Sequence, residues 1–238
     1  MSRSPLQPAA CTGSAPLAAA TPDGPHHWVI SDVHGCADSL SQLVSLLPSR
    51  DRIVLCGDVI NRGPRIEEAM ELAWYLVSCG RAIWLMGNHE QALVHSLRGS
   101  EPSDRVALAG CDTYRQLGSR NCRRWLERLE QLPLTHSGPG WLATHAGFDP
   151  HTWQPHLTIR MAFWQAYDGR FGEVIVGHTP GPEVRRLRSI VLTDTGACYG
   201  GPLTAYCPET RAQQCVPGLR SPGRLGVPLA VGSTPSPR

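Results

Sequence analysis

The fold class of this chain follows from the pattern of residues 28–60, WVISDVHGCADSLSQLVSLLPSRDRIVLCGDVI. Its three apolar residues at 28–30 predict a strand, which a polar, glycine-containing loop follows. Leucine and valine residues between 40 and 47 then repeat at helical spacing, and residues 53–56 predict a second strand. A strand, a helix and another strand in this order are typical of an α/β protein.

The alternation of strands and helices continues along the chain. An amphipathic helix is predicted for residues 66–76, a strand for 82–86 and a largely helical stretch for 90–132. Strands return at 141–143, 173–176, 190–193 and 203–206. We therefore predict an α/β fold in which two β-sheets pack together with helices outside.

The length and the composition indicate one domain between two tails. A chain of 238 residues can form a single core with length to spare. Residues 1–25 and 211–238 are rich in Pro, Gly, Ser and Ala, and such segments bury too little apolar surface to offset the entropy of ordering. We expect disordered tails there, a domain over residues 26–210, and its helical insert, residues 90–140, near the functional site.

The composition also excludes several classes of partner. A net charge of +2 gives no basic face for nucleic acid, and no stretch has the ~20 apolar residues of a membrane span. The nine cysteines form no CxxC pair, which makes a disulfide or zinc framework a poor interpretation. We expect reduced cysteines and a cytoplasmic protein that binds neither nucleic acid nor membranes, while the oligomeric state stays open.

A polar motif follows six of the predicted strands at the carboxyl end. In open α/β sheets these strand ends face one crevice, where ligands bind. Each motif alone has an ordinary structural explanation, because Asp and Asn after a strand usually cap a helix or form a turn. Six motifs in order make that explanation a poor one. The polar residues that they deliver are Asp32, His34, Asp58, Asn61, Arg62, Asn88, His89, His145, His178 and Asp194.

Carboxylates and imidazoles without a thiolate suit Mn²⁺, Fe or Zn. Asp32 and His34 share a loop and can reach one ion, and Asp58 from the neighbouring strand end can bridge two. The second ion would be completed by Asn88, His145 and His178. Two ions ~3.5–4 Å apart hold the attacking and leaving oxygens of a phosphoryl transfer and acidify a bridging water to hydroxide. The sequence therefore predicts a two-metal phosphoesterase.

These motifs resemble those of a known family. SDVHGC (31–36), GDVINRGP (57–64), GNHE (87–90), THAG (144–147), VGHT (176–179) and DTGACYGGPLT (194–204) are similar to motifs of the calcineurin-like metallophosphoesterases, more narrowly of the bacterial serine/threonine phosphoprotein phosphatases. The resemblance covers about residues 27–207 and implies a β-sandwich flanked by helices, with two divalent ions that are commonly Mn²⁺. It also implies that a metal-bridging hydroxide attacks phosphorus, that His89 protonates the leaving oxygen, and that Arg62 holds phosphate oxygens.

The chain departs from the family pattern at two places. Asn61 stands where the family usually has an Asp that orients and charges the catalytic histidine. Asn61 can accept a hydrogen bond through its amide oxygen but carries no charge, so we expect a lower pKa for His89 than in relatives with Asp. The family's second phosphate-binding arginine is missing after Trp164, and Arg160 or Arg170 would have to replace it.

The sequence leaves the substrate open between two enzymatic interpretations. GNHE, VGHT and DTGA favour a phosphatase that acts on phosphoproteins or small phosphomonoesters, which is the interpretation we prefer. The DTGACYGGPLT segment and the missing Asp before Arg62 also suit a symmetrical diadenosine tetraphosphate hydrolase, although Glu90 stands where that branch usually has Asp. A third interpretation is a non-catalytic scaffold that binds phosphorylated partners, and the complete set of metal ligands argues against it.

Overall fold

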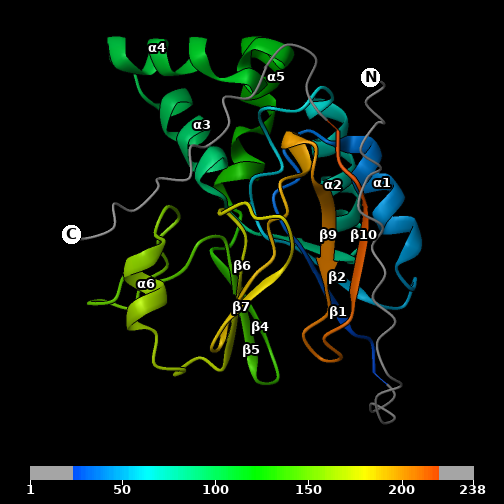
Figure 1. The fold of residues 1–238 in the computed structure, drawn as a ribbon. Coiled ribbons are helices and arrows are strands. Elements are labelled where there is room, and N and C mark those ends of the chain that lie inside the picture. Colours follow the sequence, from blue (N-terminus) through cyan, green and yellow to red (C-terminus); the bar gives the residue numbers. More distant parts are fainter. Residues whose placement is uncertain (1–23, 220–238) are drawn as a thin grey trace, which may run out of the picture.

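The computed structural model describes residues 24–219, which form two five-stranded β-sheets packed against each other (Figure 1). The first sheet contains β1 (His27–Ile30), β2 (Arg52–Leu55), β3 (Ala82–Trp84), β9 (Pro202–Tyr206) and β10 (Gln213–Pro217), in the order β10-β9-β1-β2-β3. The second contains β4 (Thr135–Gly138), β5 (Trp141–Thr144), β6 (Glu173–Val176), β7 (Arg185–Leu187) and β8 (Ile190–Leu192), in the order β4-β5-β6-β8-β7.

Helices cover the outer faces of both sheets (Figure 1). The helices α1 (Ala37–Leu46), α2 (Ile66–Ser78), α3 (Asn88–Arg98) and α5 (Asp112–Glu130) share one apolar core with the first sheet, and α4 (Pro102–Gly110) connects α3 to α5. The short α6 (Met161–Ala166) packs on the second sheet, and a 3₁₀ turn, η1 (Ala197–Tyr199), precedes β9. The predicted α/β fold, with two packed sheets and helices outside, is confirmed.

The central strands are buried on both faces, which explains their unbroken apolar sequences. In β1, Val29 faces the second sheet, whereas Trp28 and Ile30 face the helices. In β6, Ile175 faces the first sheet, and its two neighbours face the α6 side. Because side chains alternate along a strand, each central strand contributes to two layers of the core.

Three strands in each sheet run parallel to one another. In the first sheet β1 pairs with β2 and β2 with β3; in the second β5 pairs with β6 and β6 with β8. Within each set the carboxyl ends therefore lie along one edge of the sheet. These six strands are the ones whose ends carry the polar motifs.

The structure corrects the end of the domain. The expected boundary at residue 210 is too early, because β10 pairs with β9 along its whole length and buries Val216. As an edge strand, β10 has little of the apolar pattern that reveals a buried strand. The sequence also did not predict the strands β4 and β7 or the helix α6. The remainder of the predicted tails, residues 1–23 and 220–238, lies outside the described residues.

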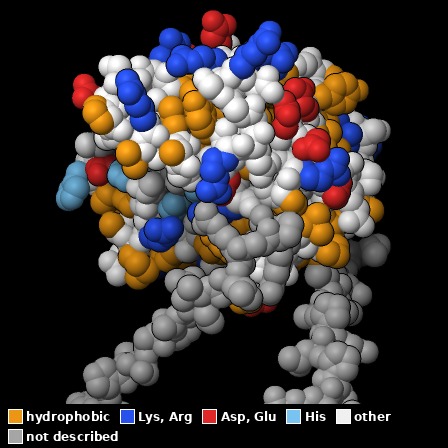
Figure 2. All heavy atoms as spheres, turned by 90° about the horizontal axis from the view of Figure 1, so that it is seen from above, with side chains coloured by type: hydrophobic (Ala, Val, Ile, Leu, Met, Phe, Trp, Pro, Cys, Tyr) orange, Lys and Arg blue, Asp and Glu red, His pale blue; other side chains and the backbone are white. Residues whose placement is uncertain are grey.

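Three further features concern membrane spans, cysteines and the distribution of surface charge. No helix within residues 24–219 combines the length and the apolar composition of a membrane span. The eight cysteines in this part of the chain are all free. On the face shown in Figure 2, arginine and acidic side chains are scattered among hydrophobic ones rather than separated by charge.

Candidate metal centre

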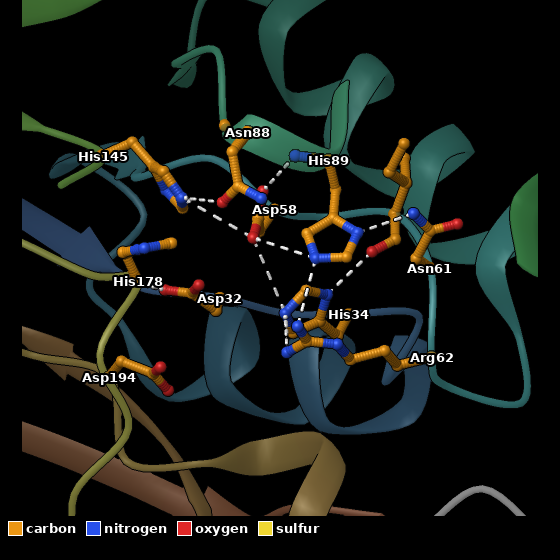
Figure 3. A network of polar contacts seen from close by, with 12 residues as sticks. Asp32, His34, Asp58, Asn61, Arg62, Asn88, His89, His145, His178 and Asp194 are labelled. Carbon is orange, nitrogen blue, oxygen red and sulfur yellow. Dashed lines mark hydrogen bonds and ion pairs between the residues drawn. The ribbon is translucent and has the colours of Figure 1, made fainter. Parts of the chain in front are cut away.

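Asp58 lies at the centre of the strand-end residues (Figure 3). Its Oδ2 atom is 3.7 Å from Nε2 of His34, 3.8 Å from Nε2 of His89 and 3.6 Å from Nε2 of His145. Two groups could each hold a metal ion: His34, Asp58 and His89, and Asp58, His145 and His178, with the ligand atoms of each group within 4.8 Å of one another. Asp58 belongs to both groups, which is where a carboxylate that bridges two ions would have to lie.

The imidazole rings are oriented as metal ligands are. Nδ1 of His34 lies 2.8 Å from the carbonyl oxygen of Ile60, and Nδ1 of His145 lies 2.9 Å from that of Cys56. Because a carbonyl oxygen only accepts, each Nδ1 carries the proton and each Nε2 keeps its lone pair for a metal. Nε2 of His178 is buried and has no hydrogen-bond partner among the described residues.

A close contact between Asn88 and His145 also fits a cation. Oδ1 of Asn88 lies 2.9 Å from Nε2 of His145. Burial lowers the pKa of His145, so the ring is neutral at ordinary pH, and its one proton is on Nδ1. The lone pairs of Asn88 Oδ1 and His145 Nε2 therefore face each other and repel. A cation bound by both atoms would remove this repulsion.

Asp32 completes the acidic side of the centre without belonging to either group. Its Oδ2 accepts a hydrogen bond from the backbone nitrogen of His178 at 2.9 Å. Burial, followed by the negative charges of Asp194 and Asp58, raises the pKa of Asp32. A Cβ atom at Gly177 would collide with this carboxylate, so glycine is needed at that position. Divalent ions would relieve the repulsion among the three carboxylates.

The backbone of the site is strained. Eight residues other than glycine have a positive φ in the described part of the chain. Positive φ is uncommon for residues with a Cβ atom, and it persists where the surrounding structure enforces it, often at functional sites. Five of the eight belong to the predicted site: His34 (46°), Asp58 (50°), Asn61 (66°), Arg62 (67°) and His178 (63°).

Asn61 contacts His89 through its amide nitrogen. Its Oδ1 accepts hydrogen bonds from the backbone nitrogen of Thr113 at 2.9 Å and from the Thr113 hydroxyl at 2.7 Å. Its Nδ2 lies 2.7 Å from Nδ1 of His89. The Asn61 oxygen accepts hydrogen bonds, as expected, but its donor is Thr113, and the amide nitrogen is the atom that faces His89. With Nδ1 accepting, a neutral His89 carries its proton on Nε2, the atom that faces Asp58.

Arg62 points into the same space as His89. Its NH1 and NH2 atoms lie 2.8 Å from Nε2 of His34 and 3.1 Å from Nε2 of His89. Burial, followed by the positive charge of Arg62, lowers the pKa of His89 to about 4. Asn61 is not among the causes of this shift, so the lower pKa relative to family members with Asp stays a prediction. Because the Nε2 proton of neutral His89 faces another donor, this contact is weak, and the guanidinium can turn toward an anion.

The two candidate replacements for the missing arginine differ in position. Arg170 is occupied by Asp168, 2.7 Å away on the surface. Nε of Arg160 lies 3.2 Å from Oγ1 of Thr179, the residue after His178. The pKa of His178 falls to about 3 because of burial and nearby positive charges, that of Arg160 among them. Arg160, and not Arg170, is therefore close to the centre.

Glu90 holds the loop that carries Asp58. It is fully buried, and its carboxylate accepts hydrogen bonds from the backbone nitrogens of Asp58 (2.9 Å), Val59 (2.8 Å), Ile60 (3.3 Å) and Gly87 (3.1 Å). In the sequence, Glu90 stands out only as the residue where the symmetrical hydrolases usually have Asp. An acidic residue three positions after the residue that precedes a helix is a capping signal, but that signal reveals only the partner at Gly87.

Comparisons with known proteins agree with this geometry. A family model described as calcineurin-like phosphoesterase matches residues 26–207. An asymmetrical bis(5′-nucleosyl)-tetraphosphatase of Halalkalibacterium halodurans is 27% identical over 218 residues, which cover 74% of this chain and 87% of that protein. Serine/threonine-protein phosphatase 1 of Salmonella typhimurium is 27% identical over 207 residues, 75% of this chain and 90% of that protein.

Two further matches are more partial or more distant. A symmetrical bis(5′-nucleosyl)-tetraphosphatase of Xylella fastidiosa is 29% identical over 140 residues, so the match spans 57% of this chain and less than half, 46%, of that protein. The crystal structure of a metallophosphoesterase from Sphaerobacter thermophilus superposes with a TM-score of 0.52 at 23% identity, covering 82% of this chain and 89% of that one. That likeness is one of fold.

Proposed function

The chain belongs to the calcineurin-like phosphoesterase family and is a metal-dependent phosphoesterase, and we propose that it hydrolyses phosphomonoesters, in particular proteins phosphorylated on serine or threonine. The observation that carries this proposal is the position of Asp58, shared by two groups of ligand atoms and flanked by His89 and Arg62. In this proposal the ions are Mn²⁺. One would be held by Asp32, His34 and Asp58, and the other by Asp58, Asn88, His145 and His178.

Each side chain then has a chemical task. Two divalent ions would acidify the attacking water and neutralise charge on the phosphate. Arg62 turns from His34 to grip two phosphate oxygens with its forked guanidinium, and Arg160 contacts the phosphate from the side of His178. As the oxygen of water bonds to phosphorus, the bond to the leaving oxygen breaks. His89 in its imidazolium form gives its Nε2 proton to that oxygen and becomes neutral, and solvent then returns a proton to the ring.

Two observations support a phosphatase over a symmetrical tetraphosphate hydrolase. The similarity to serine/threonine-protein phosphatase 1 extends over 90% of that protein, whereas the similarity to symmetrical tetraphosphatases covers 46% of one and 66% of another. Glu90 accepts three backbone hydrogen bonds across the gap from the Asp58 loop. The Asp usual in the symmetrical branch is one methylene shorter, so this loop is built for Glu.

A second candidate function is the symmetrical hydrolysis of diadenosine tetraphosphate. It is favoured by Tyr199, whose side chain is 53% exposed and whose ring centroid lies 5.3 Å from Cζ of Arg62. An exposed aromatic ring next to a phosphate-binding arginine could stack on a nucleobase. For either substrate we propose a cytoplasmic location, which the free cysteines of the described residues support.

A direct comparison of substrates tests the proposal. Mn²⁺-loaded protein is incubated separately with phosphoserine, phosphothreonine and phosphotyrosine peptides and with diadenosine tetraphosphate. We expect kcat/KM for the best phosphopeptide to exceed that for the dinucleotide by about tenfold or more, a difference of about 1.4 kcal/mol in transition-state stabilisation. A reversed ratio would support the second candidate instead. The chelated enzyme and the His89→Asn variant serve as inactive controls, and full activity in either would overturn the assigned chemistry.

A further inference from the structure

A cavity of about 220 Å³ lies beside His89, and none of the proposed metal ligands lines it. Its walls include the apolar side chains of Ala92 and Leu93 from α3 and of Ala107 and Leu108 from α4. Leu93 is buried, whereas Ala92 and Ala107 are exposed at the rim, so the cavity opens to solvent. Among the residues that line the cavity, His89 and Cys111 are the two with an ionisable side chain.

His89 and Asn61 belong both to this cavity and to the proposed active site. The leaving oxygen of a substrate must lie within hydrogen-bond distance of His89 to receive its proton. The phosphoryl group lies on the opposite side of that oxygen, near Arg62 and Asp58. The remainder of the leaving group therefore extends past His89, where the cavity begins.

The cavity differs sharply from the metal centre in charge. A nucleotide leaving group such as ADP carries several negative charges, and the cavity lining has no arginine to pair with them. Burying a charge without a partner is unfavourable, whereas apolar groups gain by leaving water. In size, a cavity of ~150 Å³ is already large enough to bind benzene. One aromatic ring therefore fits, and a highly charged group does not.

We propose that this cavity binds the apolar part of the leaving group, and that the enzyme prefers phosphomonoesters whose alcohol carries an uncharged apolar group about the size of one aromatic ring. This inference rests on the proposed function and names its substrate class. In a phosphoprotein such a ring belongs either to a phosphorylated tyrosine or to an aromatic side chain next to a phosphorylated serine. Both sources present the same chemistry to Leu93 and Leu108.

The test compares two phosphomonoesters with alkyl leaving groups, benzyl phosphate and ethyl phosphate, in two matched variants. Ala107→Leu fills part of the cavity, whereas Ala109→Leu makes the same change at an exposed position of α4 that does not line it. We expect the ratio of kcat/KM for benzyl over ethyl phosphate to fall about tenfold in Ala107→Leu and to stay at the wild-type value in Ala109→Leu. A ratio in Ala107→Leu equal to that of the wild type overturns the inference.

Binding of benzylphosphonate and ethylphosphonate, which are not hydrolysed, separates the inference from the proposed function. If the wild type prefers benzylphosphonate and Ala107→Leu removes that preference, the inference about the cavity is supported, whether or not the protein hydrolyses phosphomonoesters. A protein that shows this preference but hydrolyses no phosphomonoester would overturn the proposed function alone. Equal affinity for both phosphonates in the wild type overturns the inference. Three peptides then identify the source of the ring: one with phosphotyrosine, one with phosphoserine next to Phe and one with phosphoserine next to Gly. The kcat/KM of each of the first two is divided by that of the Gly peptide, and the ratio that falls in Ala107→Leu marks the source.

Discussion

An amide at position 61 acts on His89 in a way that a carboxylate cannot. The backbone nitrogen of Thr113 donates to Oδ1 of Asn61, which fixes the orientation of the amide and turns Nδ2 toward Nδ1 of His89. The ring therefore keeps its proton on Nε2, facing the metal ligands. Asn61 thus sets which nitrogen carries the proton, but it adds no charge that would favour a doubly protonated ring.

Asn61→Asp should shift the pH dependence of the reaction. The new carboxylate can keep the Thr113 hydrogen bond with one oxygen and accept from a protonated Nδ1 of His89 with the other. Its negative charge favours the imidazolium, so the pKa of His89 rises from its low value of about 4. The acid then stays protonated to higher pH, and the alkaline limb of kcat/KM against pH moves upward.

The control for this experiment is Asn121→Asp, the same change in α5 outside the site. It should leave the limb in place. Identical profiles for wild type and Asn61→Asp, measured with the Mn²⁺-loaded enzyme, would contradict the assigned role of Asn61.

Glu90→Gln should destabilise the protein and weaken its metal site. The amide nitrogen of Gln cannot accept, so at least one of the four backbone donors now bound to Glu90 loses its partner in the core. A buried donor without a partner costs about 1–3 kcal/mol. We expect a lower urea midpoint for the metal-free protein and weaker Mn²⁺ binding, because the Asp58 loop is released.

Glu127→Gln is the matched control for Glu90→Gln, since Glu127 is exposed on α5. It should unfold at the wild-type midpoint. A Glu90→Gln variant with the stability and the Mn²⁺ affinity of the wild type would show that the four hydrogen bonds contribute little.

At the scale of elements, the strand ends explain why residues far apart in sequence meet. The parallel strands β1, β2 and β3 deliver Asp32, Asp58 and Asn88, and β5 and β6 deliver His145 and His178 (Figure 3). The first set belongs to one sheet and the second set to the other. The centre therefore forms only when the two sheets are packed together.

The edge strand β10 gives a prediction at this scale. It pairs with all five residues of β9, buries Val216, and accepts a hydrogen bond from Oγ of Ser39 at the carbonyl oxygen of Pro217 (2.8 Å). A chain that ends at residue 211 should be less stable than one that ends at 219 by about 2 kcal/mol or more, since burying a valine alone contributes roughly that much. Equal melting temperatures of the two truncated chains would mean that β10 adds nothing to the sheet.

At the scale of the whole molecule, metal binding and folding are linked. Ions that bind only the packed sheets stabilise the folded state in proportion to their affinity. Burial raises the pKa of Asp58 to about 7 in the metal-free protein. Below that pH a proton occupies the carboxylate and must leave before an ion can bind, so the affinity falls as the pH falls and levels off above it.

Calorimetry of the metal-free and the Mn²⁺-loaded protein tests this linkage. The increase in Tm that Mn²⁺ causes should be larger at about pH 8 than at about pH 6. Asp58→Asn should abolish the increase at both pH values, because an amide cannot bridge two ions as a carboxylate does. A shift in Tm that is independent of pH would contradict the raised pKa of Asp58.

Much of the fold and most of the site residues could be predicted from the sequence, because the central strands have a clear local pattern. Strands such as β1 and β6 are buried on both faces and read as short apolar runs, and the motif after each run names the residue at the strand end. The edge strand β10 and the short α6 carry too little apolar pattern for that. The hydrogen bonds of Glu90 to the Asp58 loop could not be predicted, because their donors lie about 30 residues earlier in the chain.

The side chains that end the central strands can be read from the order of amino acids, because hydrophobic periodicity and polar motifs are local properties of the chain. How those side chains act on one another follows from the tertiary structure. It turned the amide of Asn61 toward His89, brought Arg160 and not Arg170 to the centre, and opened the apolar cavity between α3 and α4. These outcomes depend on contacts between distant segments, such as that of Thr113 with Asn61, and no local pattern encodes them.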